Sequence, residues 1–425
     1  MRDIIRDLAL RSLKNFVGIN NDYAAQLKEI SELKKLIEER EAHWEKRQSE
    51  LIEDRDKWLS LYDKAQFAAD YLMEHAKNDV PSITEQTHWP VKIFDLKPDP
   101  NVCYFNPSIC KLANGRVFMF VRRNSNRGGQ EETKFSEHND IVAFEMDPET
   151  MEPIGQKRII TLKGNHVGEH FEDPRVLAVG NSIWLSVSSF VWRKSYTHQA
   201  FFQLDQNLQC TLRIDPIYGK NFMQATVNEG NEKNWLFFPY AGNPHFIYST
   251  HPHTVLQCDR NLSVVQKHET WETNPLWKHG HPRGGSVPVL VDGQYWSFFH
   301  SSLPWTLQKR RYHMGVYSFE PQPPFRITSM TSLPLLTGSN KDPWYPLLPL
   351  VVFPGGAIYD EKTDLWTVVL GVNDLDCAKL TIPHADVKAL CRPVRFKIDE
   401  PETKVDEFAP VKASTGQDIE LNSKA

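Results

Sequence analysis

Phe171-Glu172-Asp173-Pro174-Arg175, followed by a turn at Gly180-Asn181 and the apolar run Ile183–Val187, is one copy of a pattern that recurs along the chain. Each copy joins a Pro- or Gly-containing approach to a turn and then to a strand rich in aromatic and β-branched residues. The other copies centre on Phe105-Asn106-Pro107-Ser108, Trp235–Tyr240, Gly285-Ser286-Val287-Pro288 and Phe353-Pro354-Gly355-Gly356. Five copies predict a mainly β fold, a five-bladed β-propeller, because each blade is one repeated four-stranded unit. A β-sandwich is the competing architecture, but it gives no reason for the motif to return.

The composition narrows the class of protein. Of 425 residues, 40% are hydrophobic and 24% are charged, which is ordinary for a globular protein. The formal net charge of −5 shows no basic excess, so no nucleic acid is expected as a partner. The six cysteines form no CxxC pair, and the N-terminus lacks the apolar core of a secretory signal. We therefore expect a cytoplasmic protein without a metal or other cofactor.

The first 80 residues have a different pattern. Apolar residues recur every seven positions from Tyr23 to Leu72, without Pro or Gly between Gly18 and Pro81. This stripe predicts a long α-helical, coiled-coil-like segment that buries one face, either in a homo-oligomer or on the chain's own globular part. The preceding residues 1–17 mix apolar and basic side chains, so contact with a membrane surface is a lesser alternative. The predicted domains are thus residues 1–80, a propeller at 81–396 and a flexible polar tail at 397–425.

The approach motifs carry the polar residues of interest. The inner strands of a propeller converge on a central channel, so residues far apart in sequence are expected to meet there. Carboxylates at such a site could transfer protons and cations could hold an anionic group. The alternative is that Asp-Pro and Asn-Pro only start turns. The candidates are Asn106, Ser108, Arg122, Glu172, Asp173, Arg175, Lys233, Asn234, Arg283, His300 and Asp374.

These motifs resemble glycoside hydrolase family 130, the five-bladed β-mannoside phosphorylases and hydrolases, and the related propeller mannosyltransferases. The resemblance runs over about residues 101–389 and leaves out the N-terminal segment and the tail. Its matching pieces are the motifs of Asn106 and Asp173, then Glu232-Lys233-Asn234, Gly285-Ser286-Val287-Pro288, Tyr312-His313-Met314-Gly315, Phe353-Pro354-Gly355-Gly356-Ala357 and Gly371-Val372-Asn373-Asp374.

The resemblance implies roles for individual residues. Asp173 would be the general acid, acting on the glycosidic oxygen directly or through a sugar hydroxyl. The implied substrate-binding residues are Asn106, Ser108, Arg122, Glu172, Lys233, Asn234 and Asp374. The implied phosphate-binding residues are Arg175, Arg283, His300 and His313, although Arg175 could instead clamp Asp173.

One observation bears on the reaction. A hydrolase that inverts the anomeric centre needs a second carboxylate as base, whereas the first approach motif offers the amide Asn106. Phosphorolysis of a β-mannoside, with inorganic phosphate as nucleophile, needs no such base and is the leading expectation. Asp374 or Asp376 could still serve as base, which leaves hydrolysis open. The motifs are also compatible with a glycosyltransferase that uses a sugar phosphate or sugar nucleotide, and with a non-catalytic glycan-binding propeller.

Overall fold

The computed structural model describes residues 31–40, 42–43, 46–47, 89–97, 102–124, 139–162, 169–191, 196–215, 232–272, 276–304, 310–339 and 350–395. The chain divides into two compact units, Met1–His75 and Ala76–Ala425. The predicted boundary at Pro81 and the predicted tail at 397–425 both lie outside the described residues.

The long N-terminal helix that the sequence predicts is not seen. Within the described residues of the first unit, helix is present only at 31–40, 42–43 and 46–47. Leu33, Leu36 and Ile37 of this stretch are 46%, 52% and 42% exposed, so no apolar partner covers them among the described residues. The stripe is also incomplete, since Arg40 and Arg47 stand where a second apolar position would be needed. A single apolar position per heptad does not build a coiled-coil seam. The rest of the stripe lies outside the described residues.

The second unit contains four four-stranded antiparallel sheets, which are blades of a β-propeller. The first consists of β2 (Cys103–Lys111), β3 (Val117–Asn124), β4 (Asn139–Met146) and β5 (Pro153–Ile160). The second consists of β6 (Glu169–Val179), β7 (Ser182–Val191), β8 (Tyr196–Leu204) and β9 (Cys210–Ile214). The third consists of β10 (Leu236–Tyr240), β11 (Asn243–Thr250), β12 (His253–Cys258) and β13 (Val264–Thr270). The last, built from β20 (Val352–Asp360), β21 (Leu365–Val372) and β22 (Asp376–Pro383), takes β1 (Val91–Ile93) as its outer strand.

The prediction of five equivalent four-stranded blades is wrong for the remaining group. Its strands form one seven-stranded sheet of β14 (Arg283–Gly284), β15 (Val289–Val291), β16 (Gln294–Pro304), β17 (Arg310–Phe319), β18 (Ile327–Thr331), β19 (Leu336–Thr337) and β23 (Cys391–Pro393). The expected inner strand is split into β14 and β15, which both pair with β16. Between them the Ser286 hydroxyl accepts the Phe298 N–H at 2.9 Å. A side chain thus replaces a backbone carbonyl, and the ladder is interrupted.

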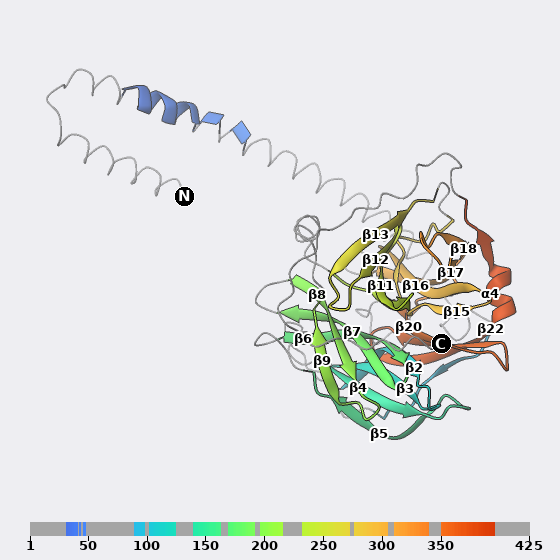
Figure 1. Cartoon of the computed structure of the whole chain (residues 1–425). Coiled ribbons are helices and arrows are strands. Elements are labelled where there is room, and N and C mark those ends of the chain that lie inside the picture. The colour runs from blue at the N-terminus through green and yellow to red at the C-terminus, as the bar shows by residue number, and fades with distance from the viewer. Residues whose placement is uncertain are drawn as a thin grey trace. The chain divides into compact units, whose positions relative to one another are not determined.

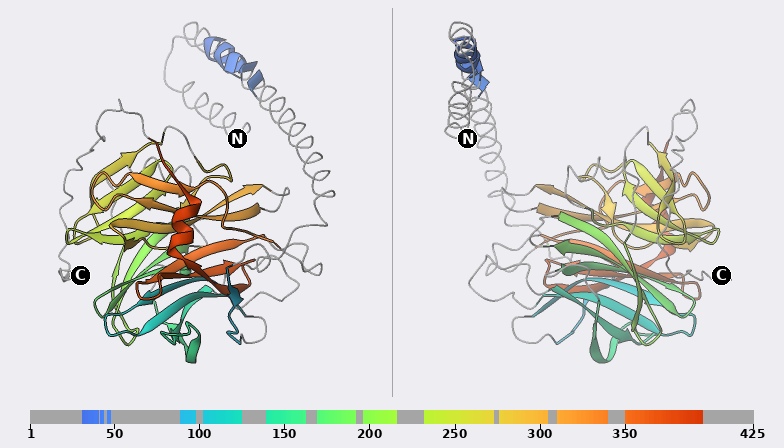
Figure 2. Two further views of the ribbon diagram at one scale, coloured as in Figure 1. Left: turned by 90° about the vertical axis from the view of Figure 1, so that its right-hand side faces the viewer. Right: turned by 60° about the vertical axis from the view of Figure 1, so that its left-hand side comes forward.

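The sheets form a closed ring. β2 contacts β6 and β20, β6 contacts β10, β11 contacts β14, and β16 contacts β20 (Figures 1 and 2). Aromatic and aliphatic side chains fill the space between neighbouring sheets: Phe118 and Phe120, for example, share a cluster with Leu185 and Phe202. Among the largest fully buried side chains are Trp235, Trp366, Tyr317, Phe201, Phe238 and Phe298. Many of the abundant aromatic residues therefore build the core.

A short helix lies near the end of the described chain. α4 (His384–Leu390) follows β22 and leads into β23. None of the described helices is long and apolar enough to cross a membrane.

Candidate active site

The Asn-Pro and Asp-Pro pairs are bulges within the inner strands. Asn106 and Asp173 both have a φ of 51°, in the left-handed region that Asn and Asp tolerate better than most residues. The pairing register shifts at these points, between Phe105 and Ser108 in β2 and between Glu172 and Arg175 in β6. Such bulges re-aim side chains and are frequent beside active sites. The Asn-Pro and Asp-Pro pairs therefore form bulges within strands and do not start turns.

Glycines of the last sheet lie directly against the first bulge. A Cβ on Gly371 would collide with the Asn106 side-chain oxygen, and one on Gly355 would collide with the Pro107 carbonyl. The bulge therefore depends on close backbone approach by β20 and β21, which only glycine permits here.

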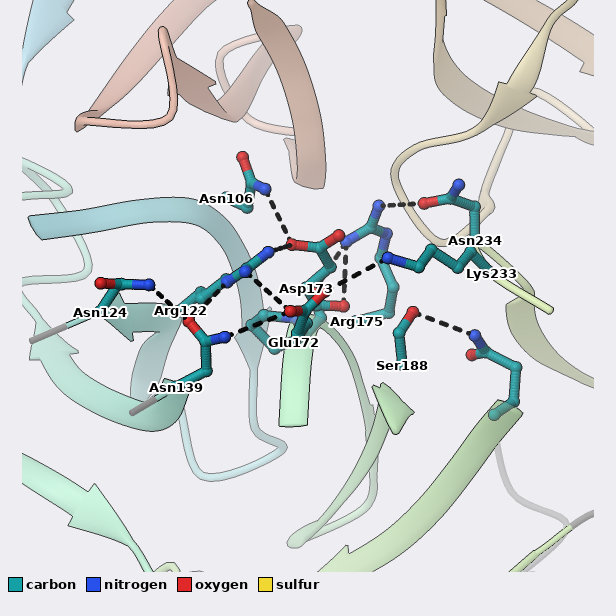
Figure 3. A network of polar contacts seen from close by, with 12 residues as sticks. Asn106, Arg122, Asn124, Asn139, Glu172, Asp173, Arg175, Ser188, Lys233 and Asn234 are labelled. Atoms are coloured by element: carbon teal, nitrogen blue, oxygen red, sulfur yellow. Dashed lines mark hydrogen bonds and ion pairs between the residues drawn. The ribbon is translucent and has the colours of Figure 1, made fainter. Parts of the chain in front are cut away.

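Arg122 joins the two carboxylates of the Glu-Asp-Pro-Arg motif. Its Nη2 lies 2.8 Å from Oε1 of Glu172 and its Nη1 lies 3.2 Å from Oδ1 of Asp173. The Asn106 amide donates to the same Asp173 oxygen at 2.8 Å, and Lys233 Nζ lies 3.2 Å from Oε2 of Glu172 (Figure 3). Side chains of the first two sheets and of the segment before β10 thus converge on two adjacent carboxylates.

Arg175 braces the backbone of the motif. Its Nη1 donates to the carbonyls of Pro174 at 3.0 Å and Asp173 at 3.3 Å, and its Nη2 lies 3.5 Å from the Asn234 side-chain oxygen. The guanidinium stacks over the Phe353 ring at 4.7 Å, and Phe353 also packs on His300. The structure therefore gives Arg175 the clamping contacts, and it leaves Nε buried without a partner among the described residues.

The charge state of Asp173 follows from these neighbours. Burial alone would raise the pKa of its carboxyl. Three cations oppose burial and, with the Asn106 amide, lower the pKa to about 2. These cations are Arg122, Lys233 and Arg175. Asp173 is thus a carboxylate in the unliganded protein.

His300 is neutral for a related reason. Burial lowers the pKa of its imidazole to about 3, and the positive charges of Arg175 and Arg283 act in the same direction. A neutral ring can donate from one nitrogen and accept at the other, which suits a polar ligand.

Three buried polar atoms beside Asp173 have no hydrogen-bond partner among the described residues. They are the Asn106 side-chain oxygen, Arg175 Nε and His300 Nδ1. Unpaired buried polar atoms are rare and costly, so three of them around one carboxylate set this cluster apart from the rest of the core.

The other predicted residues divide into two sets. Asp374 acts electrostatically on Arg122, and Arg283 lies opposite His300 in the ladder, so both adjoin the cluster. Ser108 is fully buried and its hydroxyl accepts the Val176 N–H at 3.1 Å, which is a link between sheets. His313 bonds to Thr337 and packs on His279 instead of joining the cluster.

The sequence interpretation missed two residues. Asn139 Nδ2 donates to Glu172 at 3.2 Å, and its side-chain oxygen accepts from Arg122 Nε at 3.1 Å. Tyr312, next to His313, interacts electrostatically with Asp374 and Asp173. Strand alternation at 310–313 could have favoured Tyr312, whereas no sequence signal singles out Asn139.

Metal ligation has no support in the described part of the chain, where no group of three or more His, Cys, Asp or Glu side chains could hold an ion. The chemistry available at this site is proton transfer by a carboxylate and binding of an anion by cations.

Comparisons with known proteins agree with the fold. No family profile and no curated protein matches the chain. The β-1,2-mannobiose phosphorylase of Listeria innocua superposes with a TM-score of 0.50 at 14% identity, over 71% of this chain and 96% of its own. A structure of the GH130 family of mannoside phosphorylases, which contains hydrolases that target β-1,2-mannosidic linkages in Candida mannan, superposes at 0.52 and 12% identity, over 72% and 96%.

A GDP-Man-dependent mannosyltransferase from Leishmania mexicana also matches, with a TM-score of 0.49 at 13% identity, over 74% of this chain and 94% of its own. This score is too low to support an argument. The predicted resemblance to mannoside phosphorylases is confirmed, and at these identities it establishes the fold alone.

Proposed function

We propose that the chain is a carbohydrate-active enzyme that cleaves a β-mannoside by phosphorolysis. The observation that carries the proposal is the setting of Asp173: a buried carboxylate on a strand bulge, beside Arg122, Lys233 and Arg175 and three unpartnered polar atoms. A sugar can bind beside this carboxylate, and phosphate can bind to the cations. The shared fold with mannoside phosphorylases supports the substrate class.

Phosphate is favoured over water as the nucleophile because of Asn106. In the position where an inverting hydrolase would use a carboxylate base, Asn106 offers an amide whose N–H is already donated to Asp173. Phosphate arrives as an anion with a nucleophilic oxygen and needs no base. Asp374, which lies near Arg122 and Tyr312, is the residue to test if water proves to be the nucleophile.

Asp173 must gain a proton before it can act as an acid, because its pKa is low in the unliganded protein. A phosphate dianion bound beside Arg175 and Lys233 would offset the cations that lower this pKa, so Asp173 would take up a proton as the complex forms. A phosphate oxygen then attacks the anomeric carbon, the bond from that carbon to the leaving oxygen breaks, and the Asp173 proton passes to that oxygen. The products are an inverted sugar 1-phosphate and a shortened saccharide.

A glycosyltransferase is the second candidate, and the ionised state of Asp173 beside a group of cations is the observation that favours it. A carboxylate already ionised without ligand could accept the proton of an acceptor hydroxyl. The acceptor oxygen would attack the anomeric carbon of a sugar phosphate or sugar nucleotide, and the phosphate would depart onto the same cations.

One set of assays separates these reactions. β-Linked manno-oligosaccharides are incubated with and without inorganic phosphate, and a panel of mannose phosphate and mannose nucleotide donors is incubated with a saccharide acceptor. Phosphorolysis predicts phosphate-dependent release of mannose 1-phosphate. Turnover only from an activated donor would establish the transferase instead, and phosphate-independent cleavage would establish a hydrolase. Saccharide binding without any turnover would leave a glycan-binding propeller.

A further inference from the structure

Trp271, just beyond β13, is the only Phe, Tyr or Trp side chain of the described residues that is largely exposed. It is 48% exposed, whereas the other described aromatic side chains are buried or half-buried. Large aromatic side chains are normally withdrawn from water because they carry much apolar surface. Single exposed apolar side chains are common on protein surfaces, so the surroundings of this indole decide whether it marks a site.

The indole is also held in a fixed orientation. Its Nε1 donates to Oε1 of Glu269 at 3.1 Å, and Oε2 of Glu269 lies 2.7 Å from Lys267 Nζ. These three residues alternate along the end of β13, so they share one face of the strand. An aromatic face that is ordered before a ligand arrives loses little conformational entropy on binding.

Two imidazole rings lie in a row beside the indole. The His251 ring packs edge-on against Trp271 with centroids 6.0 Å apart, and His281 lies 6.4 Å from His251. Burial lowers the pKa of His281, and the charges of Arg283 and His251 lower it further. The neighbourhood therefore offers imidazole nitrogens that can bond to hydroxyls beside a flat apolar surface.

Strand pairing places Trp271 at the same end of the third sheet as residues of the candidate active site. Thr250 of β11, His253 of β12 and Thr270 of β13 pair side by side, which places His251 and Trp271 at one end of the third sheet. The same end carries Lys233 and Asn234, because they precede β10 and β10 is antiparallel to β11.

Arg283 completes the connection. It acts electrostatically on His281 on one side and on His300 on the other, and His300 in turn interacts with Asp173. Electrostatic interactions thus link Asp173 with His281, and ring contacts link His281 through His251 to the exposed indole.

We propose that Trp271, with His251 and His281, forms a distal subsite for a further neutral sugar residue of an oligosaccharide whose reacting end lies at Asp173. The apolar C–H face of a pyranose would stack on the indole, and its hydroxyls would bond to the two imidazoles. An anionic group is held better at the exposed Arg283, which is why the distal ligand is assigned as neutral. The inference rests on the proposed function, because it extends the same saccharide site.

The test compares substrate lengths. The kcat/KM values of β-linked manno-oligosaccharides of two to five units are measured for the wild type, Trp271→Ala and Trp271→Phe. Trp271→Ala is expected to lower kcat/KM for the longer substrates by roughly three- to tenfold, the range for one aromatic stacking contact, and to leave the disaccharide unchanged. Trp271→Phe should recover part of the loss. Leu290→Ala, at a side chain that is 55% exposed on β15, is the matched control and should change neither value.

A binding measurement tests the distal subsite independently of the proposed reaction. Calorimetric titration with the same oligosaccharides needs no turnover. If no reaction is found but the longer saccharides bind in a way that Trp271→Ala weakens, the subsite stands and the proposed reaction fails. If Trp271→Ala folds normally by circular dichroism and leaves the length dependence of binding and turnover unchanged, the subsite is overturned.

Discussion

The Asn106 amide nitrogen lies 2.8 Å from Oδ1 of Asp173, which joins two residues that share a φ of 51° and a following proline. The two bulges are therefore equivalent positions of neighbouring sheets that face each other across the site. One presents a carboxylate and the other an amide, and this difference determines what the site can do. The amide stabilises the ionised form of Asp173 and cannot itself remove a proton from water.

Asp173→Asn should abolish turnover without unfolding the protein. Asn tolerates the left-handed backbone, but its amide cannot deliver a proton, and general acid–base catalysis is worth about 10²- to 10⁴-fold. The effect should fall on kcat, measured in a steady-state assay. Asp364→Asn is the matched control because Asp364 also has a positive φ, 55°, and is exposed. Turnover near wild type in Asp173→Asn would move the catalytic role to another carboxylate, with Asp374 tested next.

Arg175→Ala should raise the KM for phosphate and also lower kcat. The guanidinium holds the carbonyls of Asp173 and Pro174, so its removal loosens the catalytic backbone as well as removing a charge. Leaving buried groups unpaired should also lower the free energy of unfolding by about 1–3 kcal/mol. Arg175→Lys keeps the charge and should recover KM better than stability. A change in KM alone would mean that Arg175 contacts phosphate but does not position Asp173.

Asn106→Asp should shift the pH dependence of the reaction upward. A second carboxyl at hydrogen-bond distance from Asp173 cannot be ionised at the same time without repulsion, so the pKa of the pair rises. The acid would then stay protonated to higher pH, and the basic limb of the kcat/KM profile would move to higher pH. Asn106→Ala, which removes the donor without adding a charge, is the comparison. Identical profiles for the two variants would contradict this account.

Acid should destabilise the fold through buried histidines in the third sheet. Burial lowers the pKa values of His245 and His253 to about 4, while in the unfolded chain they are near 6.5. Their contribution is complete above pH 6.5 and is lost as the pH falls from 6.5 to 4, because the unfolded chain binds the protons first. The free energy of unfolding should decline by about 1 kcal/mol per pH unit for each histidine, measured by urea denaturation. His253→Gln should reduce that slope, and an unchanged slope would exclude His253 as its source.

Two truncations test which part of the chain the propeller requires. A protein that starts at Pro81 keeps β1 and should melt like the full chain. A protein that starts at Pro98 loses Val91–Ile93, the outer strand of the last sheet, and should melt several degrees lower. Equal melting temperatures for both would show that β1 contributes nothing to stability.

The repeated approach motif predicted the strands and turns of this fold because both depend on local sequence. Gly115, Gly180, Gly242 and Gly293 have positive φ values at the predicted turns between strands. The seven-stranded sheet was not predictable in the same way: β19 and β23 join it by pairing with β17 and β18, and nothing in their own residues indicates those partners.

The candidate site could be predicted where the motif supplied it and not elsewhere. Glu172, Asp173 and Arg122 come together because bulges and strand ends place them at one end of the ring. Asn139 escaped prediction, since its position opposite Asn124 in the ladder is set by pairing across a long connection. The heptad stripe gave an incorrect prediction because periodicity alone does not show that a partner face exists.

The order of strands in the last sheet constrains how the protein is made. β1 precedes every other described strand of the propeller, yet its hydrogen-bonding partner β22 begins only at Asp376. During synthesis β1 must wait, unpaired, until almost the whole propeller has left the ribosome. Lys379, also on β22, then bonds to Glu152 and to the carbonyls of Thr150 and Met151, which lie between β4 and β5 of the first sheet. These contacts therefore form at the same stage as the pairing of β1 with β22. Until these contacts form, the ring of sheets is not closed. Chaperones would therefore protect the nascent chain most during this late interval.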